Sequence, residues 1–203
     1  GVRNSSITSV FSQGSLLASD SPTAFAIEGK GFFAVRGQDR DNSYTRNGNF
    51  GFAIGTNGNL VLSNTDGLPV LDTTGSAIVL GPEFVASKIT VTADGQLCYP
   101  DATNNPQPIG ITIGVFQFSN PAGLEKKGDT LYGETVASGQ ALNEANNANL
   151  DKSRVIQGYL EGSSVQVANE MVNMIVAQRA YELNSKAITT SDEMIQIAND
   201  LKR

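Results

Sequence analysis

The sequence predicts a mainly β protein with three parts: a β-rich body shaped as an irregular sandwich or barrel, an antiparallel ribbon, and one long C-terminal α-helix. Turn dipeptides separate short apolar segments at intervals of about ten residues, a spacing typical of all-β domains. Two segments of strand composition, residues 7–17 and 154–160, lie on either side of the body in the sequence. From Val165 to Leu201 the chain contains neither Gly nor Pro, which is typical of a helix.

Four segments are expected along the chain. They are an extended arm at residues 1–24, the β-rich body at 25–150, a return strand at 151–164 and an assembly helix at 165–203. A chain of 203 residues is long enough for one large domain, or for one domain with an appendage. It opens on Gly1-Val2-Arg3-Asn4, and no secretory signal pattern follows.

The arm carries too few large apolar residues to form a core of its own; they are Ile7, Val10, Phe11, Leu16 and Leu17. Ile7–Phe11 has the composition of a strand, and Arg154–Leu160 has a similar composition with a Gly inside it. We therefore predict that residues 7–17 pair with residues 154–160 in an antiparallel ribbon that links the body to the helix.

Within the body, Phe25–Val35 indicates two short strands separated by a glycine-flanked turn. Ile109–Phe118 alternates apolar and polar residues, which predicts one half-buried strand. Asn120–Glu125 indicates a turn, and residues 133–153 indicate a long polar loop. Tight turns are expected where Asn or Asp precedes Gly, because these residues tolerate positive φ; the dipeptides are Asn47-Gly48, Asn57-Gly58, Asp66-Gly67 and Asp94-Gly95.

The C-terminal helix has sequence signals at both ends. Ser163 or Ser164 is the expected N-cap, because a hydroxyl accepts the unpaired N–H groups of a first turn. Lys202 and Arg203 follow the last apolar residue, where cations suit the negative end of the helix dipole. A helix of about 37 residues would be about 55 Å long at 1.5 Å per residue.

Two apolar stripes run along this helix. One repeats every seven residues at Val167, Met174, Tyr181, Ile188 and Ile195, and the other contains Leu183, Ala187, Met194, Ile197 (or Ala198) and Leu201. The remaining seam of a coiled coil would be mostly polar, which argues against a two-stranded zipper. The helix could lie along its own domain or pack among copies of itself, and we favour packing among copies because the chain offers little other helical material. The expected assembly residues are Val167, Met171, Met174, Ile175, Tyr181, Leu183, Ile188, Met194, Ile195 and Leu201.

Composition excludes several function classes. The net charge is −6 and Lys and Arg are scattered, which argues against a nucleic-acid partner. No apolar run approaches the 18 or so residues of a membrane-spanning helix. The chain has no His, so no Ser-His-Asp, Cys-His or histidine metal site is available. Its single cysteine, Cys98, can form no internal disulfide and is expected to be a small buried apolar residue.

Three patterns contain residue types that chemical sites use. Asn57-Gly58-Asn59 and Asp94-Gly95 lack the ligand spacing of a calcium loop, so they are interpreted as structural turns. Gly29-Lys30-Gly31 lacks the spacing of a phosphate loop. Glu28, Asp39 and Asp41 could serve glycoside hydrolysis, so a secreted carbohydrate-binding module or hydrolase is kept as the rival class. We assign no catalytic, cofactor or metal residues and no small-molecule substrate.

Longer motifs near both ends resemble the bacterial flagellar rod and hook proteins. The C-terminal motifs are Gln157–Val165, Glu170–Ile175 and Gln178–Ile188, and the N-terminal ones are Ser12–Leu16, Ala26–Phe33 and Tyr44–Phe50. The likeness is weaker between residues 65 and 150. The family also carries an N-terminal helix with an Asn-Asn-Leu-Ala-Asn-type motif, which this sequence does not contain. Hook members usually have a larger insertion than this chain has room for, so the rod members are the nearer comparison. Among them the distal rod members resemble the chain most, and proximal rod and hook members are the alternatives.

The resemblance implies a non-enzymatic axial subunit of the flagellar basal body. Such subunits stack helically into a hollow, rigid shaft that spans the periplasm and transmits torque. The implied partners are copies of the same chain, neighbouring rod and hook proteins, and the L- and P-ring bushing. In such shafts the terminal helices line the central channel and pack against those of neighbouring subunits, which agrees with the two apolar stripes.

Overall fold

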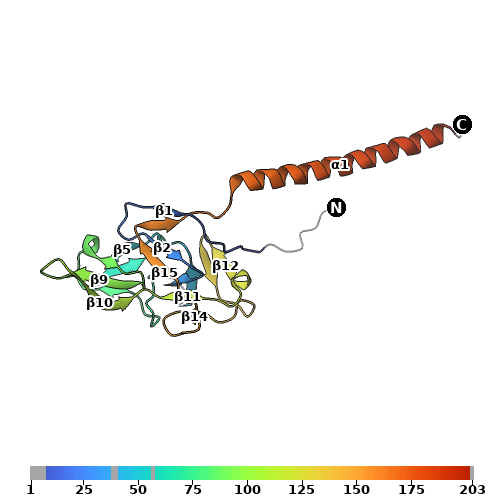
Figure 1. The fold of residues 1–203 in the computed structure, drawn as a ribbon. Helices are drawn as coiled ribbons and strands as arrows, with labels where there is room; N and C mark the ends of the chain where they lie inside the picture. The colour runs from blue at the N-terminus through green and yellow to red at the C-terminus, as the bar shows by residue number, and fades with distance from the viewer. Residues whose placement is uncertain (1–7, 38–40, 56–57, 202–203) are drawn as a thin grey trace. The chain divides into compact units, whose positions relative to one another are not determined.

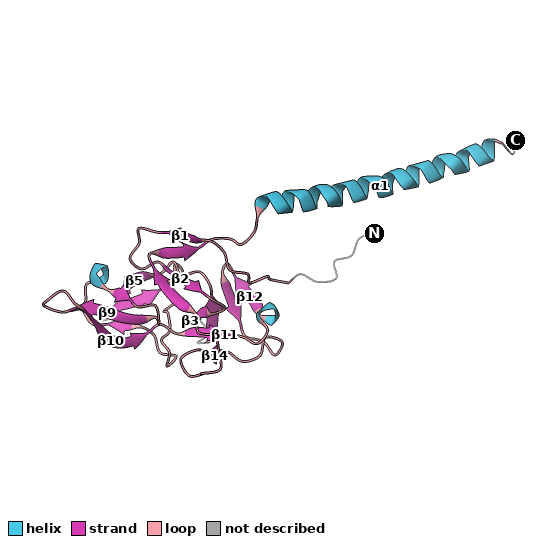
Figure 2. Ribbon diagram, in the orientation of Figure 1, coloured by secondary structure: helices cyan, strands magenta, loops and turns pink. Residues whose placement is uncertain are grey.

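A computed structural model describes residues 8–37, 41–55 and 58–201 of the chain. The chain divides into two compact units, residues 1–163 and 164–203, and each is described by itself. Strands fill the first unit, the body, which also contains the short 3-10 helices η2 (Ala86–Lys88) and η3 (Pro121–Gly123) (Figure 2). The second unit holds α1 (Val167–Asp200), the one α-helix among the described residues (Figure 1).

The strands of the described residues form five antiparallel sheets, and none of these closes into a barrel. The largest has the order β12-β13-β4-β3-β11-β14. Its strands are β3 (Phe32–Arg36), β4 (Asn42–Thr45), β11 (Val115–Gln117), β12 (Glu125–Gly128), β13 (Leu131–Gly133) and β14 (Leu142–Asn143). The predicted class, a β-rich body with an antiparallel ribbon and one long helix, is confirmed.

The other sheets are smaller. One three-stranded sheet contains β5 (Gly51–Ile54), β6 (Leu60–Ser63) and β7 (Val79–Leu80), and the second contains β8 (Thr90–Val91), β9 (Gln96–Pro100) and β10 (Pro106–Thr112). The two-stranded sheets are β2 (Phe25–Glu28) with β15 (Arg154–Gln157), and β1 (Leu16–Ala18) with β16 (Tyr159–Glu161).

The β1–β16 pair is the predicted ribbon between the arm and the return strand, but its extent differs from the prediction. Leu16 lies opposite Glu161 and Ala18 lies opposite Tyr159. The earlier part of the return strand, β15, pairs with β2 instead of the arm. Residues 8–11 belong to no strand, and Ile7 lies outside the described residues. Phe11 instead packs edge-on against two rings of the body, 5.1 Å from Phe32 and 5.0 Å from Tyr132 between centroids.

Of the predicted Asn-Gly and Asp-Gly turns, one connects two strands as expected and another does not. Asp94-Gly95 does connect β8 to β9, and Gly95 adopts the φ of +79° that such a turn requires. Asn47-Gly48 makes no hairpin, because β4 and β5 belong to different sheets. The carbonyl of Gly48 instead accepts hydrogen bonds from the amides of Phe25 and Phe50, both at 2.9 Å. Asn57 lies outside the described residues.

The predicted single strand Ile109–Phe118 is two strands, because its middle pairs with segments from other sheets. The amide of Ile113 donates to the carbonyl of Gly95 at 2.8 Å, and that of Gly114 donates to Leu71 at 2.9 Å. β10 therefore stays with β9, whereas β11 joins the six-stranded sheet. The predicted loop at 133–153 includes β14, which pairs with β11.

β3 lies between two hydrophobic clusters, so both of its faces are buried. Phe33 and Val35 face a large cluster that includes Phe25, Ile27, Phe50, Leu62, Val70, Ile78, Leu97, Ile113 and Val155. Phe32 and Ala34 face a smaller cluster with Tyr44, Leu71, Phe116, Phe118 and Leu124. A strand buried on both faces is a continuous apolar run, as Phe32-Phe33-Ala34-Val35 is. Cys98 on β9 is buried, as expected.

Tyr44 on β4 belongs to the smaller cluster. Its ring packs edge-on against Phe118, with centroids 4.8 Å apart. Burial, reinforced by the nearby Glu134 carboxylate, raises the pKa of the Tyr44 phenol to about 12. The folded body therefore favours the neutral phenol over the phenolate.

Replacing Phe33 with Ala should lower the free energy of unfolding of the body by about 3–5 kcal/mol, because a fully buried ring leaves a cavity. Urea denaturation should show a lower midpoint with an unchanged slope. Val136→Ala is the control, because Val136 is fully exposed and its loss should change stability by less than about 0.5 kcal/mol. Equal effects of the two substitutions would contradict this core.

The raised pKa of Tyr44 predicts a loss of stability at high pH. The contribution is complete below pH 10, where the unfolded phenol keeps its proton, and is lost as pH rises from 10 to about 12. The free energy of unfolding should therefore fall more steeply for the wild type than for Tyr44→Phe across this window. Parallel curves from denaturation at several pH values would show that Tyr44 is not held neutral.

Candidate assembly site

Helix α1 runs without interruption through 34 residues of the second unit (Figure 1). It begins after Gln166, which has extended backbone angles of φ −88° and ψ 107° and makes no side-chain capping bond. The predicted caps Ser163 and Ser164 were therefore wrong by two or three positions. Glu170 lies in the first turn, where a carboxylate stabilises the positive end of the helix dipole. Lys202 and Arg203 lie outside the described residues.

No side chain between Val167 and Asp200 is buried within the chain. All ten predicted assembly residues are exposed. Their exposed fractions range from 49 % at Ile175 to 82 % at Leu201. The stripe that repeats every seven residues stays on one side of a helix, drifting by about 20° per repeat. The structure thus leaves both stripes uncovered, and the assembly role of the ten residues remains a prediction.

A helix of this kind gains little stability from its own sequence. Most helical stability in proteins comes from packing of an apolar face, because nucleation is costly and propagation alone is marginal. Within α1 the side-chain hydrogen bonds of the described residues are local and exposed, such as Gln178 to Glu182 at 3.3 Å. We therefore expect the helix to need contacts that this unit does not supply by itself.

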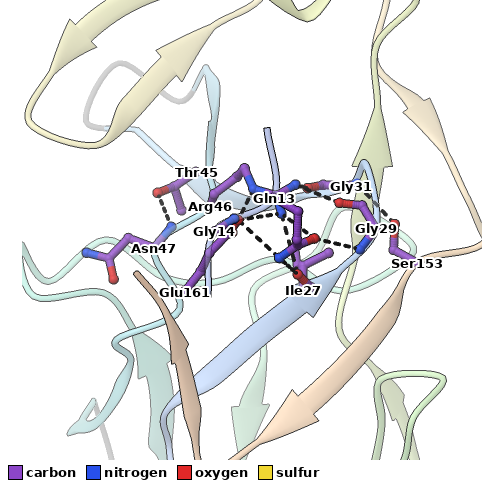
Figure 3. A network of polar contacts seen from close by, with 10 residues as sticks. All are labelled: Gln13, Gly14, Ile27, Gly29, Gly31, Thr45, Arg46, Asn47, Ser153 and Glu161. Atoms are coloured by element: carbon purple, nitrogen blue, oxygen red, sulfur yellow. Dashed lines mark hydrogen bonds and ion pairs between the residues drawn. The ribbon is translucent and has the colours of Figure 1, made fainter. Parts of the chain in front are cut away.

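The body contains a buried ion pair close to the ribbon. The guanidinium of Arg46, just after β4, donates from Nε to Glu161 Oε2 at 2.7 Å and from Nη2 to Glu161 Oε1 at 3.0 Å (Figure 3). Both side chains are largely buried, with 13 % and 9 % of their surface exposed. The guanidinium also lies 5.8 Å from the centre of the Phe32 ring. This two-point pairing is the strongest geometry that arginine makes with a carboxylate.

The remaining donors of Arg46 hold the turn between β2 and β3. Nη1 donates to the carbonyls of Gly29 at 3.0 Å and Gly31 at 2.9 Å, and Nη2 reaches the Ile27 carbonyl at 3.4 Å. The side chain of Gln13 in the arm completes the set, with its Oε1 accepting from Arg46 Nη2 at 3.2 Å. We call Gln13, Arg46 and Glu161, with these three carbonyls, the clasp (Figure 3).

The same turn is held on its other side by Ser153, which is itself hydrogen-bonded to the buried carboxylate of Glu144. The amide of Gly31 donates to Ser153 Oγ at 3.0 Å, and Ser153 Oγ donates to Glu144 Oε1 at 2.8 Å. Glu144 also accepts from the Ser153 amide at 2.6 Å and from Gln117 Nε2 at 2.9 Å. Neutral donors thus satisfy a carboxylate that is only 5 % exposed.

Sequence reasoning placed Arg46 and Glu161 in separate motifs and did not pair them. They lie 115 residues apart, and no local pattern joins them. The available signal was a single Arg and a single Glu, each within two residues of a Gly in a segment otherwise apolar or uncharged: Tyr44–Phe50 and Gln157–Val165.

The carboxylates weighed for hydrolysis do not converge in the described part of the chain. Glu28 pairs with Arg154 at 3.6 Å on the surface. Asp41 lines a separate open cavity of about 350 Å³ together with Asp66, Lys127 and Asp129. Asp39 lies outside the described residues. Across residues 8–37, 41–55 and 58–201 no three metal-binding side chains gather, and no helix there has the length and apolar character to cross a membrane.

Two family models match separate parts of the chain. The family described as "Flagellar basal body rod FlgEFG protein C-terminal" matches residues 156–201, and "Flagellar hook protein FlgE/F/G D1 domain" matches residues 26–99. The flagellar basal-body rod protein FlgG of Borreliella burgdorferi is 41 % identical over 100 % of this chain and 73 % of its own length. FlgG of Buchnera aphidicola subsp. Schizaphis graminum is 39 % identical over 99 % and 73 %, and FlgG of Caulobacter vibrioides is 36 % identical over 100 % and 73 %.

A β-rich body, a short ribbon and a long helix with no buried side chain, together with these matches, define the class as a structural subunit of the flagellar axis. The chain belongs to the flagellar rod and hook protein family, and within it to the basal-body rod subunits. The predicted resemblance to the distal rod member is confirmed, because FlgG proteins match the chain throughout. The proximal rod and hook alternatives are not favoured.

The exposed stripes predict that α1 is weakly held in a dilute monomer. Amides of residues 170–200 should exchange with solvent far faster than those of β3, because few contacts oppose local opening. Hydrogen exchange followed by mass spectrometry at micromolar concentration measures this directly. Protection of 170–200 equal to that of the body, in a sample shown to be monomeric, would contradict the prediction.

Proposed function

We propose that this chain polymerises helically into the distal part of the flagellar rod, with α1 as the principal assembly element. The family already implies assembly into the flagellar axial structure beside rod and hook proteins, in the basal body. The observation that carries the proposal is that the apolar residues of a 34-residue helix are uncovered, Met174 at 71 % and Ile188 at 64 % exposure among them. The role is mechanical and non-enzymatic.

The two stripes support packing against more than one neighbour. Val167, Met174, Tyr181, Ile188 and Ile195 form one, and Leu183, Ala187, Met194, Ile197 and Leu201 form the other. Fully burying one such large side chain stabilises an assembly by about 1.5–3 kcal/mol. Association costs about 4–15 kcal/mol in lost freedom, so several of these side chains must be buried together for a stable contact. A helical polymer can meet this condition, because each subunit contacts more than one neighbour and several residues of both stripes are then buried at once.

Membership of the family supports a proposal for the wider setting. We infer a shaft that spans the periplasm, turns within the L- and P-ring bushing and transmits torque to the hook. A rigid shaft needs subunits that do not deform, and the two clusters on either side of β3 provide a densely packed body.

The test replaces Met174 and Ile188 with Asp in the full-length gene of a motile bacterium that encodes the protein. Each buried, unpaired carboxylate costs several kcal/mol, and every subunit in the polymer would carry both. Rods should be absent from isolated basal bodies in electron micrographs, and swimming should stop. The near-UV circular dichroism of the purified variant should be unchanged, because the body does not use these residues.

The matched control places the same two charges on the polar seam, as Gln178→Asp and Ser185→Asp. These substitutions alter net charge and helix propensity by similar amounts but leave the apolar stripes intact. The control strain should swim and build rods. Normal rods in the Met174→Asp, Ile188→Asp strain would sink the proposal, and failure of both strains would assign the effect to charge or helix formation.

A further inference from the structure

Two segments that are far apart in sequence meet at the clasp. Gln13 Nε2 in the arm donates to Glu161 Oε1 at 3.1 Å, across 148 residues, and to the Ile27 carbonyl at 3.0 Å. The amide of Gly14 donates to the same Glu161 oxygen at 2.9 Å. Gln13 Oε1 also accepts from the Gly29 amide at 3.0 Å. Glu161 and the β2–β3 turn thus hold one short piece of the arm from two sides (Figure 3).

The arm and the segment after β16 also touch through their backbones. The amide of Gly162 donates to the Ser15 carbonyl at 2.8 Å, and the amide of Ser19 donates to the Gly158 carbonyl at 2.8 Å. A Cβ atom on Gly14 would lie 1.9 Å from the Gly162 carbonyl oxygen, so only glycine permits this approach. We call residues 158–163 the stem.

Neither segment has enough burial to hold itself in place. β1 and β16 form an isolated two-stranded sheet, and such ribbons are marginally stable in water. Leu17 and Tyr159 remain exposed on it. Besides the Phe11 ring contacts and the backbone bond from Gly162 to Ser15, the described polar contacts of residues 8–15 converge on the clasp. The hydrogen bonds of the clasp therefore supply much of what holds the ribbon in one position.

We propose that the clasp couples the arm to the stem, so that the two segments dock on the body together and are released together. Arg46 and Glu161 act as positioning residues that set where both segments leave the body. Removing one partner of a buried pair leaves an uncompensated charge, which penalises the docked state of both segments at once. Lysine cannot replace Arg46, because a single ammonium cannot span the carboxylate and the turn carbonyls. This coupling does not depend on α1 being the assembly element.

The test compares Gln13→Ala with Glu161→Gln in the complete chain, using hydrogen exchange resolved at single amides by NMR. The informative amides are those of Ser19 and Gly162, because both bridge arm and stem and neither touches the Gln13 or Glu161 side chains. Cooperative release predicts that either substitution lowers protection at both amides by a similar factor of about ten or more, the effect of losing a hydrogen bond to a charged group. A purely local effect would change Gly14 and Gly29 alone.

Two controls separate coupling from general damage. The amide of Ile113, bonded to Gly95 within the body, should keep its protection in both variants. Val10→Ala, in the arm but 80 % exposed, should leave Ser19 and Gly162 unchanged. Arg46→Lys should behave like Glu161→Gln.

The inference is overturned if Gln13→Ala leaves Gly162 protected, or if Glu161→Gln releases the stem while Ser19 stays protected. Full protection in Arg46→Lys would likewise remove the positioning role. If Glu161→Gln unfolds the body, seen as loss of protection at Ile113, Gln13→Ala decides the question, because Gln13 lies outside both hydrophobic clusters.

Discussion

The guanidinium of Arg46 joins four parts of the body: the arm, the β2–β3 turn, the end of β4 and β16. A buried ion pair is costly to desolvate, so its net contribution to stability is small even where breaking it would cost about 3–5 kcal/mol. The pair instead favours one arrangement of the surrounding segments over others. The N–H groups of Arg46 lie in one plane with fixed directions. They can donate to Glu161, to the Gly29 and Gly31 carbonyls and to Gln13 in one arrangement, and any other arrangement leaves buried polar groups unpaired.

The position of that turn controls the densest part of the molecule. Gly31 immediately precedes β3, whose residues Phe32 to Val35 are buried in two clusters at once. A one-residue slip of β3 would exchange the residues that face each cluster. The clasp holds the turn carbonyls from one side, while Ser153 and Glu144 hold the Gly31 amide from the other. Polar groups at the edge of the core thus help to set the register of its apolar centre.

Local sequence patterns predicted the strands, turns and helix well, but not which distant segments each of them contacts. The Phe25–Val35 strands, the Asp94-Gly95 turn and the long helix follow from composition over a few residues. The break at Ile113-Gly114 and the Arg46–Glu161 pair depend on partners distant in sequence, which periodicity does not encode. The helix start was misplaced because Gln166 takes the cap position without a side-chain bond. The apolar stripes could be found from spacing alone, but what covers them is a property of an assembly.

The stability of the body and the stability of the helix differ in how they depend on protein concentration. The body buries Phe32, Phe33 and Ile27 completely within one chain, so its stability does not depend on protein concentration. The helix exposes Met174 and Leu183, and any partner that covers them stabilises it by mass action. A subunit with this division can fold its body before it meets a neighbour and order its helix only on contact. The stem that precedes the helix in sequence belongs to the first unit, and the Arg46–Glu161 pair fixes it there, three residues before the second unit begins at Ser164.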